Sequence, residues 1–198
     1  MTKASEAVLE EIWRSLHAAT ARHTPFTLGY LGTVDAEGAP RVRAVILRRV
    51  DREWGELALA TDRRSAKVSE IAGNPRVALT VYDEERSVQQ RIEGRARLDD
   101  SAERERVWVS LGSHSRDLYR SPWAPGTILP AEAGDDVEPR PAETHAEAAT
   151  DDAAAFERFA WVRIECERLD WLDLSASPQE RWEFRRGADE WEGQRIVP

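Results

Sequence analysis

The sequence predicts a mainly β protein, an antiparallel barrel of roughly six or seven strands with peripheral helices. Two observations predict this class. Short segments of alternating apolar and polar residues recur along the chain, with turn residues between them. Helical spacing of apolar residues, by contrast, is confined to the N-terminus and a few short stretches. Because 198 residues suit one core, we expect a single domain over residues 1–198.

The first element is predicted to be a helix, with Ser5 as its candidate cap and Pro25 ending the segment. The apolar residues at helical spacing are Val8, Leu9, Ile12, Trp13 and Leu16. The period then changes to two, which predicts a hairpin. Its parts are a strand over residues 26–34, a turn at 35–38 and a returning strand over 41–50.

The middle of the chain continues the sheet. Residues 57–61 are a short strand, and residues 65–72 are a short helix that ends before Pro75. Residues 77–82 are apolar on both faces, as in a central strand. Residues 88–98 alternate between a mainly apolar face and a polar, charged one, which predicts a half-buried strand.

Helices and a long loop follow. A helix is expected over residues 101–111, and a second short one running to Tyr119. Residues 131–152 contain eight acidic residues, one basic residue (Arg140) and no aromatic residue. We expect this segment to be a mobile acidic loop, and its role stays open.

A long strand is predicted over residues 161–173, with a change of phase inside it. Alternate residues up to Cys166 are apolar, whereas Leu169 and Trp171 have the opposite parity. A bulge near Arg168 reconciles the two phases. The last segments are a strand over residues 181–186, a turn at 187–189 and a terminal strand that holds Trp191.

Composition excludes several classes of protein. The net charge of −9 gives no basic excess for nucleic-acid binding. No apolar stretch approaches the roughly 18 residues of a membrane span, and the N-terminus lacks a signal region. Cys166 is the only cysteine, which suits a reducing compartment. We therefore expect a soluble, cytoplasmic protein that binds neither nucleic acid nor membrane.

Side-chain chemistry for catalysis is sparse. The four histidines lack the spacing of a metal site, so no metal is expected. Cys166 lies in an apolar strand phase and is expected in the core. Neither a glycine-rich phosphate loop nor a Ser-His-Asp arrangement is recognisable. If the protein is an enzyme, a cofactor carries its chemistry.

Basic, hydroxyl and aromatic residues suit a phosphorylated, flat cofactor. A phosphate needs Arg or Lys donors beside a small hydroxyl, as in the segment from Ser65 to Lys67. A flavin ring needs an aromatic or apolar surface, and donors near the edge that becomes anionic on reduction. Trp171 and Arg181 supply residues of these two kinds.

An ordered set of motifs resembles the FMN-binding half of the pyridoxamine 5'-phosphate oxidase family, from Phe26 onward apart from the acidic loop. The motifs are Arg43-Ala44-Val45-Ile46-Leu47-Arg48, Ala60-Thr61, Ser65-Ala66-Lys67, Asn74-Pro75-Arg76-Val77, Gln89 five residues before Gly94, Trp171 and Arg181. The resemblance implies a split β-barrel homodimer that binds FMN at the subunit interface.

The resemblance also implies the site residues. They are Arg43, Ala44, Val45, Ile46, Arg48, Ala60, Thr61, Ser65, Lys67, Gln89, Trp171 and Arg181. In this reading Arg43 and Lys67 bind the phosphate, and Gln89 binds the ring or ribityl chain. Trp171 and Arg181 come from the partner subunit. Strand parity places Arg43 and Arg48 on opposite faces unless a bulge intervenes, so their roles should differ.

The chain departs from the family pattern in three places, one of which is the loop at Ser121-Pro-Trp-Ala-Pro125, where the family's Gln-Ser pair is replaced. Ala66 stands where the family has an Arg, which Arg63 or Arg64 could replace as a phosphate donor. Ser177 and Gln179 stand where oxidases of pyridoxamine phosphate carry Arg and His. The sequence therefore resembles a less characterised branch of the family, with the cofactor site kept and the substrate site changed.

Several functions stay open. The first is an FMN-dependent oxidoreductase acting on an unidentified small molecule. The alternatives are a flavin carrier or redox sensor without turnover, pyridoxamine 5'-phosphate oxidase itself, and a barrel without a cofactor. Bound FMN that is reduced faster than free FMN would separate an enzyme from a carrier.

Overall fold

The computed structural model describes residues 1–99, 102–128, 145–188 and 190–198. Its strands are β1 (Leu28–Val34), β2 (Pro40–Asp51), β3 (Glu56–Asp62), β4 (Arg76–Asp83), β5 (Val88–Leu98), β6 (Phe159–Asp173), β7 (Glu180–Arg186) and β8 (Trp191–Ile196). Its helices are α1 (Lys3–Ala21), the 3-10 turn η1 (Pro25–Thr27), α2 (Ala66–Gly73), α3 (Ala102–Ser110), α4 (Ser113–Asp117) and α5 (His145–Arg158).

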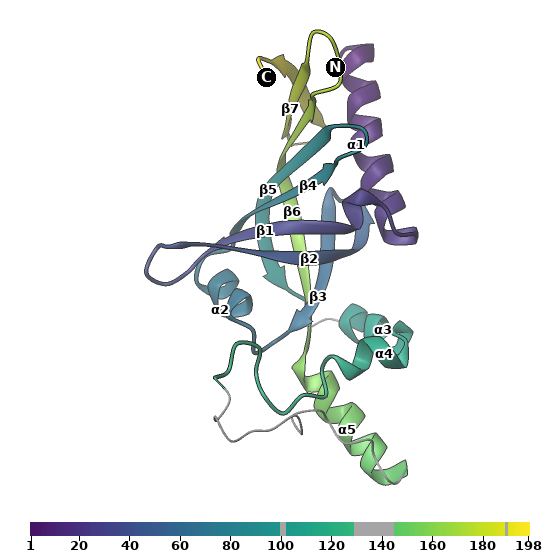
Figure 1. Ribbon diagram of the computed structural model, residues 1–198, viewed down its shortest axis with the longest axis vertical. Helices are drawn as coiled ribbons and strands as arrows, with labels where there is room; N and C mark the ends of the chain where they lie inside the picture. The colour runs from purple at the N-terminus through teal and green to yellow at the C-terminus, as the bar shows by residue number, and fades with distance from the viewer. Residues whose placement is uncertain (100–101, 129–144, 189) are drawn as a thin grey trace. The chain divides into compact units, whose positions relative to one another are not determined.

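The strands form one sheet in the order β3-β2-β1-β4-β5-β6-β7-β8 (Figure 1). A further pairing of β3 with β6 closes six of the strands into a barrel, which β7 and β8 extend. The hairpin partners β1 and β2, β4 and β5, and β6 and β7 are antiparallel. The predicted mainly β fold, an antiparallel split barrel with peripheral helices, is confirmed.

The chain divides into two compact units. Unit 1 comprises Met1–Leu59, Glu70–Arg97 and Arg163–Pro198. Unit 2 comprises Ala60–Ser69 and the described part of Leu98–Val162. The expectation of a single domain over residues 1–198 remains a prediction.

In unit 1, helix α1 is capped one turn earlier than the sequence predicted. The Thr2 hydroxyl accepts a hydrogen bond from the Ser5 amide at 3.2 Å, and the Ser5 hydroxyl accepts one from the Thr2 amide at 2.9 Å. This reciprocal capping box makes Thr2 the cap, so the assignment of Ser5 was wrong. The helix contacts β2, β7 and β8. Its buried apolar residues are Leu9, Ile12, Trp13, Leu16 and Ala19.

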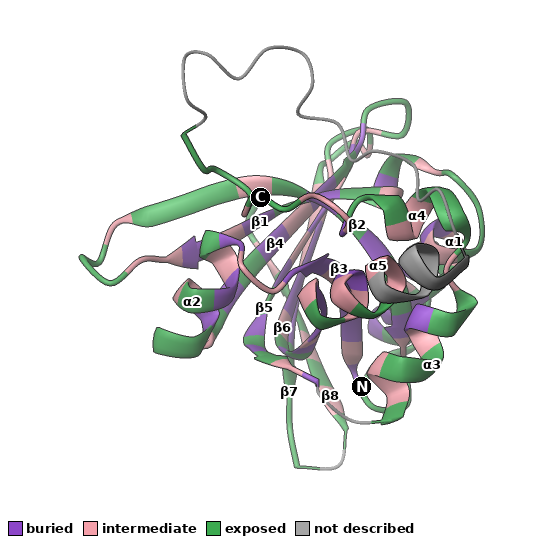
Figure 2. Cartoon of the chain, turned by 90° about the horizontal axis from the view of Figure 1, so that it is seen from below, coloured by how far each residue is buried: buried purple, intermediate pink, exposed green. Residues whose placement is uncertain are grey.

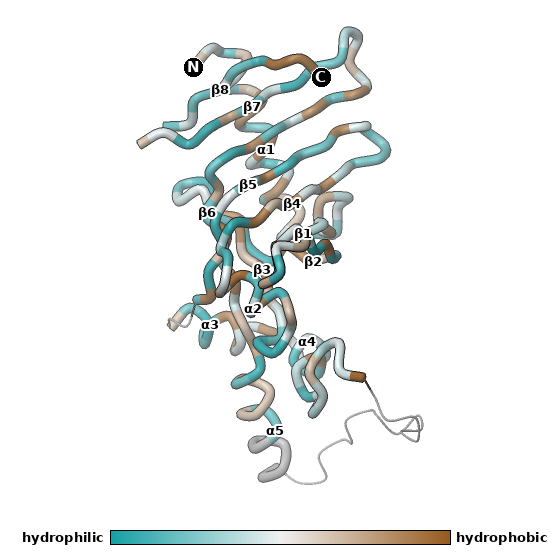
Figure 3. The backbone as a smooth tube through the Cα atoms, turned by 90° about the vertical axis from the view of Figure 1, so that its left-hand side faces the viewer, coloured by the Kyte–Doolittle hydropathy of each residue, from teal (hydrophilic) through white to brown (hydrophobic). Residues whose placement is uncertain are grey.

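The barrel interior follows the strand alternation. Residues that point inward are almost fully buried, and their neighbours point outward. The fully buried strand residues of unit 1 include Leu31, Leu47, Leu79, Ile92 and Ile164. Figure 3 shows hydrophilic and hydrophobic residues alternating along the strands.

The predicted change of phase in β6 is present. Ile164 and Cys166 are buried, Glu167 and Arg168 both lie outside, and Leu169 is buried again. Burial also raises the pKa of the Cys166 thiol above its ordinary value. Cys166 is therefore a core residue, as expected.

In unit 2, α3, α4 and α5 pack around aromatic rings. Tyr119 meets Phe159 edge-on at 5.2 Å between ring centroids, and Trp108 lies 5.5 Å from Phe159. Arg104 covers the ring of Phe156 at 4.1 Å. These aromatic contacts form the core of the described helices.

The acidic loop expected over residues 131–152 is partly wrong, because α5 begins at His145. Alanines at 146, 148, 149 and 153–155 favour a helix more strongly than the acidic charge opposes it. Residues 131–144 lie outside the described residues.

Within the described ranges, no helix is long and apolar enough to cross a membrane. In the same ranges, no group of three or more His, Cys, Asp or Glu side chains is placed to hold a metal ion.

Substituting Gly94→Ala should destabilise the protein by about 3 kcal/mol, because strands β5 and β6 approach too closely for a side chain. A Cβ on Gly94 would lie 2.0 Å from the carbonyl oxygen of Glu165. The matched control is Gly32→Ala in β1, where the nearest atom, the Ala78 carbonyl oxygen, would lie 3.5 Å away. Denaturant unfolding measures both variants, and equal midpoints would contradict the close approach.

Candidate functional site

Three residues predicted to bind the cofactor meet in unit 2, where β3 turns into α2. The Lys67 ammonium donates to the Thr61 hydroxyl at 2.8 Å and to the Ser65 hydroxyl at 3.3 Å. The two hydroxyl oxygens are 3.4 Å apart, and both residues are buried. The chain turns sharply between Thr61 and Ser65, because the Ser65 amide donates a hydrogen bond to the Asp62 carbonyl at 3.0 Å. This turn brings the two hydroxyls together. We call Thr61, Ser65 and Lys67 the Lys67 cluster.

The Lys67 cluster has the donor chemistry that a phosphate requires. One ammonium and two hydroxyls supply several hydrogen bonds and one positive charge. The residues present therefore fit the phosphate of FMN. Ala60, also assigned to the site, precedes Thr61 in β3 and is half-buried.

Arg64 is already hydrogen-bonded to protein groups outside the Lys67 cluster. Its guanidinium holds the Asp62 carboxylate at 2.7 and 3.0 Å and donates to the carbonyl oxygens of Ser121 and Pro122, each at 3.0 Å. The hydrogen bond with Asp62 raises the pKa of Arg64. Arg64 thus ties a loop of unit 2 to the β3–α2 turn, and does not stand in for the donor missing at Ala66. The same role for Arg63 remains a prediction.

Arg43, in unit 1, is paired with an acid that sequence reasoning missed. Its Nη2 lies 2.6 Å from Oε2 of Glu70, and its Nη1 donates to the hydroxyl of Thr33. The Thr33 hydroxyl also bonds Glu70. Glu70 lies in α2, 27 residues after Arg43 and beyond β3, so no local sequence pattern predicts the pair. Arg43 would have to share or leave Glu70 to bind a phosphate, and its role as ligand stays a prediction.

The other β2 residues lie as strand parity predicted. Arg43 and Val45 point inward, whereas Ala44, Ile46 and Arg48 are exposed. The irregularity between Leu47 and Arg49 falls at Arg48, which nevertheless stays exposed and does not share the inward face of Arg43.

Residues of β1, β2 and β4 form an exposed apolar face of the barrel. The strand register aligns Tyr30 with Ala44 and Thr80, and Leu28 with Ile46. Tyr30 is 53% exposed and Val42 70% exposed. We define the apolar face as Leu28, Tyr30, Val42, Ala44, Ile46, Ala78 and Tyr82. Figure 2 shows exposed residues along the β1–β2 hairpin.

The same sheet face continues on β5 with polar side chains. Gln89 lies opposite Tyr82, and Arg91 lies opposite Thr80. Because directly opposed residues share a face, Gln89 and Arg91 border the apolar face. Both are partly exposed.

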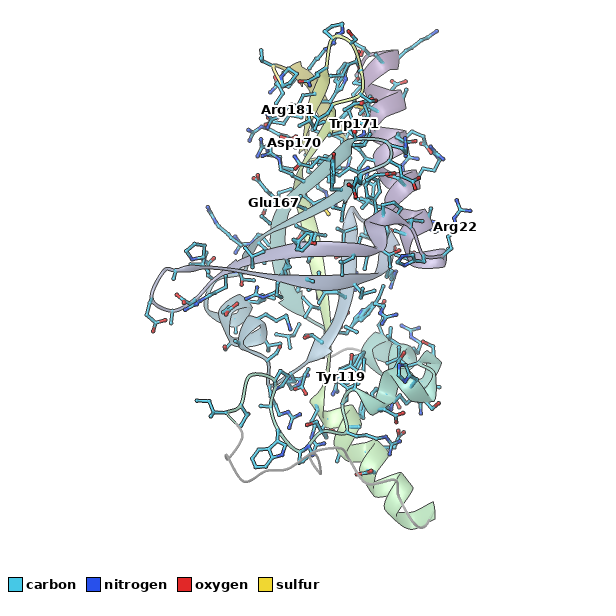
Figure 4. The ribbon with its side chains drawn as sticks, viewed as in Figure 1. Arg22, Tyr119, Glu167, Asp170, Trp171 and Arg181 are labelled. Carbon is cyan, nitrogen blue, oxygen red and sulfur yellow. The ribbon has the colours of Figure 1, made fainter. Side chains whose placement is uncertain are left out.

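Arg181 meets a buried acid on β6. Its guanidinium donates to the Asp170 carboxylate through Nη2 at 2.8 Å and Nε at 3.2 Å. Arg91 Nη2 lies 2.6 Å from the same carboxylate, and Arg168 Nη2 lies 3.6 Å away. Figure 4 shows Asp170 and Arg181 beside each other at the β6–β7 end of unit 1. We call Asp170, Arg91, Arg168 and Arg181 the Asp170 cluster.

The electrostatics of the Asp170 cluster favour the charged state. Burial alone raises the pKa of Asp170, but hydrogen bonds from Arg181 and Arg91 outweigh burial and lower it below its ordinary value of 3.8. The hydrogen bond to Asp170 in turn raises the pKa of Arg181. Asp170 and Arg91 were missed by sequence reasoning. The sequence feature that could have identified Asp170 is its position between two apolar residues, Leu169 and Trp171.

Trp171 faces away from Asp170, as strand alternation requires, and lies opposite Trp182 on β7. It is 8% exposed, and its indole Nε1 has no hydrogen-bond partner among the described residues. A buried indole N–H usually has a partner, and those of Trp171, Trp161 and Trp182 have none within the described ranges.

A closed six-stranded barrel with these basic and hydroxyl residues defines the split-barrel class. The chain belongs to the pyridoxamine 5'-phosphate oxidase family, whose model matches residues 16–170. The resemblance stated from sequence is thus confirmed at the level of the family.

Two relatives named pyridoxine/pyridoxamine 5'-phosphate oxidase show how far the similarity extends. The protein from Jannaschia sp. (strain CCS1) is 27% identical over 96% of this chain and 93% of its own length. The protein from Sphingopyxis alaskensis is 30% identical over 81% of this chain and 73% of its own length.

Among solved structures, a pyridoxamine 5'-phosphate oxidase-related, FMN binding protein from Nostoc punctiforme is similar throughout. It superposes with a TM-score of 0.72 at 26% sequence identity, over 99% of this chain and 97% of that chain.

Proposed function

We propose that this protein binds FMN and is an FMN-dependent oxidoreductase acting on a small molecule other than pyridoxamine 5'-phosphate. The Lys67 cluster carries the proposal, since it joins an ammonium and two buried hydroxyls. The similarity to the FMN binding protein of Nostoc punctiforme supports the cofactor. When bound, FMN supplies hydride transfer at its ring.

The chain's own residues would bind and orient the cofactor. Lys67 would neutralise part of the phosphate charge, while Thr61 and Ser65 would donate hydrogen bonds to its oxygens. Trp171 would offer its unpartnered indole N–H, and Arg181 its charge. A carrier or redox sensor would need the same binding residues, and faster reduction of bound than of free FMN by NAD(P)H separates the enzyme from it.

Substituting Lys67→Ala should weaken FMN binding by about tenfold to hundredfold, because one charge-assisted hydrogen bond to the phosphate is lost. Riboflavin, which lacks the phosphate, should bind the variant and the wild type equally. Quenching of flavin fluorescence measures both ligands. Lys3→Ala removes the chain's other lysine and serves as the control. An equal loss for riboflavin, or no loss for FMN, would contradict the assignment.

The proposal includes a homodimer that buries the apolar face. Tyr30→Glu should raise the dimer dissociation constant by more than about a hundredfold, because a charge would be buried without a partner. Trp54→Glu is the matched control, since Trp54 is 63% exposed at the β2–β3 turn and lies outside the apolar face. Light scattering should give about twice 22.4 kDa for the wild type and for the control. A wild-type monomer at micromolar concentration with FMN would contradict the dimer.

Pyridoxamine 5'-phosphate should be a poor substrate. Ser177 and Gln179, both exposed before β7, cannot supply the charge and the imidazole that the family oxidases place there. The double variant Ser177→Arg, Gln179→His should therefore raise turnover, by up to about a hundredfold if orientation at the flavin is restored. Formation of pyridoxal phosphate in air measures the rate. Rapid turnover by the wild type would show that other residues bind this substrate.

A further inference from the structure

In unit 2, two arginine side chains hold four consecutive backbone carbonyl groups. The carbonyl oxygens belong to Tyr119, Arg120, Ser121 and Pro122, which we call the 119–122 segment. Arg158 donates to the first two at 3.2 and 2.9 Å, and Arg64 donates to the last two at 3.0 Å each. The segment belongs to neither a helix nor a strand, so these guanidiniums take the place of regular backbone hydrogen bonds.

Both arginines are attached to the turn between β3 and α2. Arg64 is part of that turn, and the Asp62 carboxylate accepts hydrogen bonds from its Nε at 3.0 Å and its Nη2 at 2.7 Å. The Arg63 amide donates to the Arg158 carbonyl oxygen at 2.6 Å, which joins Arg158 to the same turn. The 119–122 segment and the turn are therefore connected at two points, and a movement of one should be transmitted to the other.

The same turn carries two hydroxyls of the Lys67 cluster. Thr61 precedes it and Ser65 closes it, and their hydroxyl oxygens lie 3.4 Å apart. This separation depends on the conformation of the residues between them, which Arg64 and Asp62 fix. The positive charge of Arg64 is matched by Asp62 at 2.7 Å, so its contribution to the cluster is geometric.

We propose that Arg64 is a positioning residue, which holds the turn on the 119–122 segment so that Thr61 and Ser65 converge on the phosphate of FMN. This inference rests on the proposed function. Coupling between two parts of a protein is reciprocal: if the ordered segment helps the turn to bind phosphate, bound phosphate orders the segment by the same factor. Riboflavin, which lacks the phosphate, should not order it.

The test measures flavin affinity and backbone hydrogen exchange of residues 119–123, in wild type and in Arg64→Gln. In the wild type, FMN should slow this exchange about tenfold more than riboflavin does. In Arg64→Gln, exchange of the flavin-free protein should be about tenfold faster, and the affinity for FMN about tenfold weaker, because the segment loses two carbonyl partners. The affinity for riboflavin should not change. General destabilisation alone would weaken the binding of both flavins.

Two further variants separate positioning from direct binding of the phosphate. Arg64→Lys keeps the positive charge but loses the planar fork that reaches one carboxylate and two carbonyls, so it should behave like Arg64→Gln. Lys67→Ala should weaken FMN binding without accelerating exchange of the flavin-free segment. The matched control is Arg106→Gln, which removes an exposed arginine of α3 in the same unit and should change neither quantity.

Asp62→Asn covers the case in which neither substitution at Arg64 gives folded protein. It weakens the hold on the guanidinium and keeps both carbonyl contacts of Arg64. It should therefore produce the same two changes, by about threefold each.

The outcomes separate the two proposals. Unchanged FMN affinity or unchanged exchange in Arg64→Gln, or wild-type affinity in Arg64→Lys, would overturn the positioning role and leave the proposed function standing. Wild-type protein that takes up no FMN would overturn the proposed function and this inference with it. Faster exchange together with a loss of affinity for FMN but not for riboflavin, both absent in Arg106→Gln, supports the inference.

Discussion

The closure of the barrel by β6 is the constraint on which unit 1 depends. This strand of 15 residues pairs in the barrel with β3 and continues beyond it against β7. The Cys166 amide donates to the Gly55 carbonyl at 2.9 Å, and Gly94 lies against the backbone of Glu165. Both contacts occur where the strand is fully buried on one side. A side chain at Gly94 would force the backbones apart, so the glycine is required by the closure.

The change in which alternate residues of β6 face the core arises because β6 belongs both to the barrel and to its β7–β8 extension. This change also sets the position of Asp170. Up to Cys166, the inward residues fill the barrel. From Leu169 onward the opposite parity is buried, which turns Trp171 inward and places Asp170 on the other face. An unbroken alternation would have exposed Leu169 and Trp171. The Asp170 cluster is thus a consequence of how one strand serves both the barrel and its β7–β8 extension.

Sequence predicted the features that depend on local pattern. Alternation in β5, the hairpin of β1 and β2, and the slip near Arg168 were each readable from neighbouring residues. The helical start of α5 was not predicted, because its acidic residues favour a loop whereas its alanines favour a helix. Thr2 and Ser5 are both suitable capping residues, and only the geometry of the capping box distinguishes them.

The missed site residues share a physical reason. Glu70 and Asp170 are 27 and 79 residues from the arginines Arg43 and Arg91 that they bind. An ion pair across strands depends on register and face, which a single sequence specifies only after the strands are paired. The resemblance to the family identified Arg43 and Arg181, but it did not identify the acids that pair with them, Glu70 and Asp170.

These two acids each neutralise part of the charge of the arginines that they bind. Glu70 neutralises Arg43, and Ala66 removes a further cation, so Lys67 carries more of the proposed phosphate binding. Asp170 joins Arg91 to Arg181, and its negative charge offsets the positive charge of one of the two arginines. Under the proposed function, phosphate binding therefore depends mainly on Lys67, since Arg43 is already paired with Glu70.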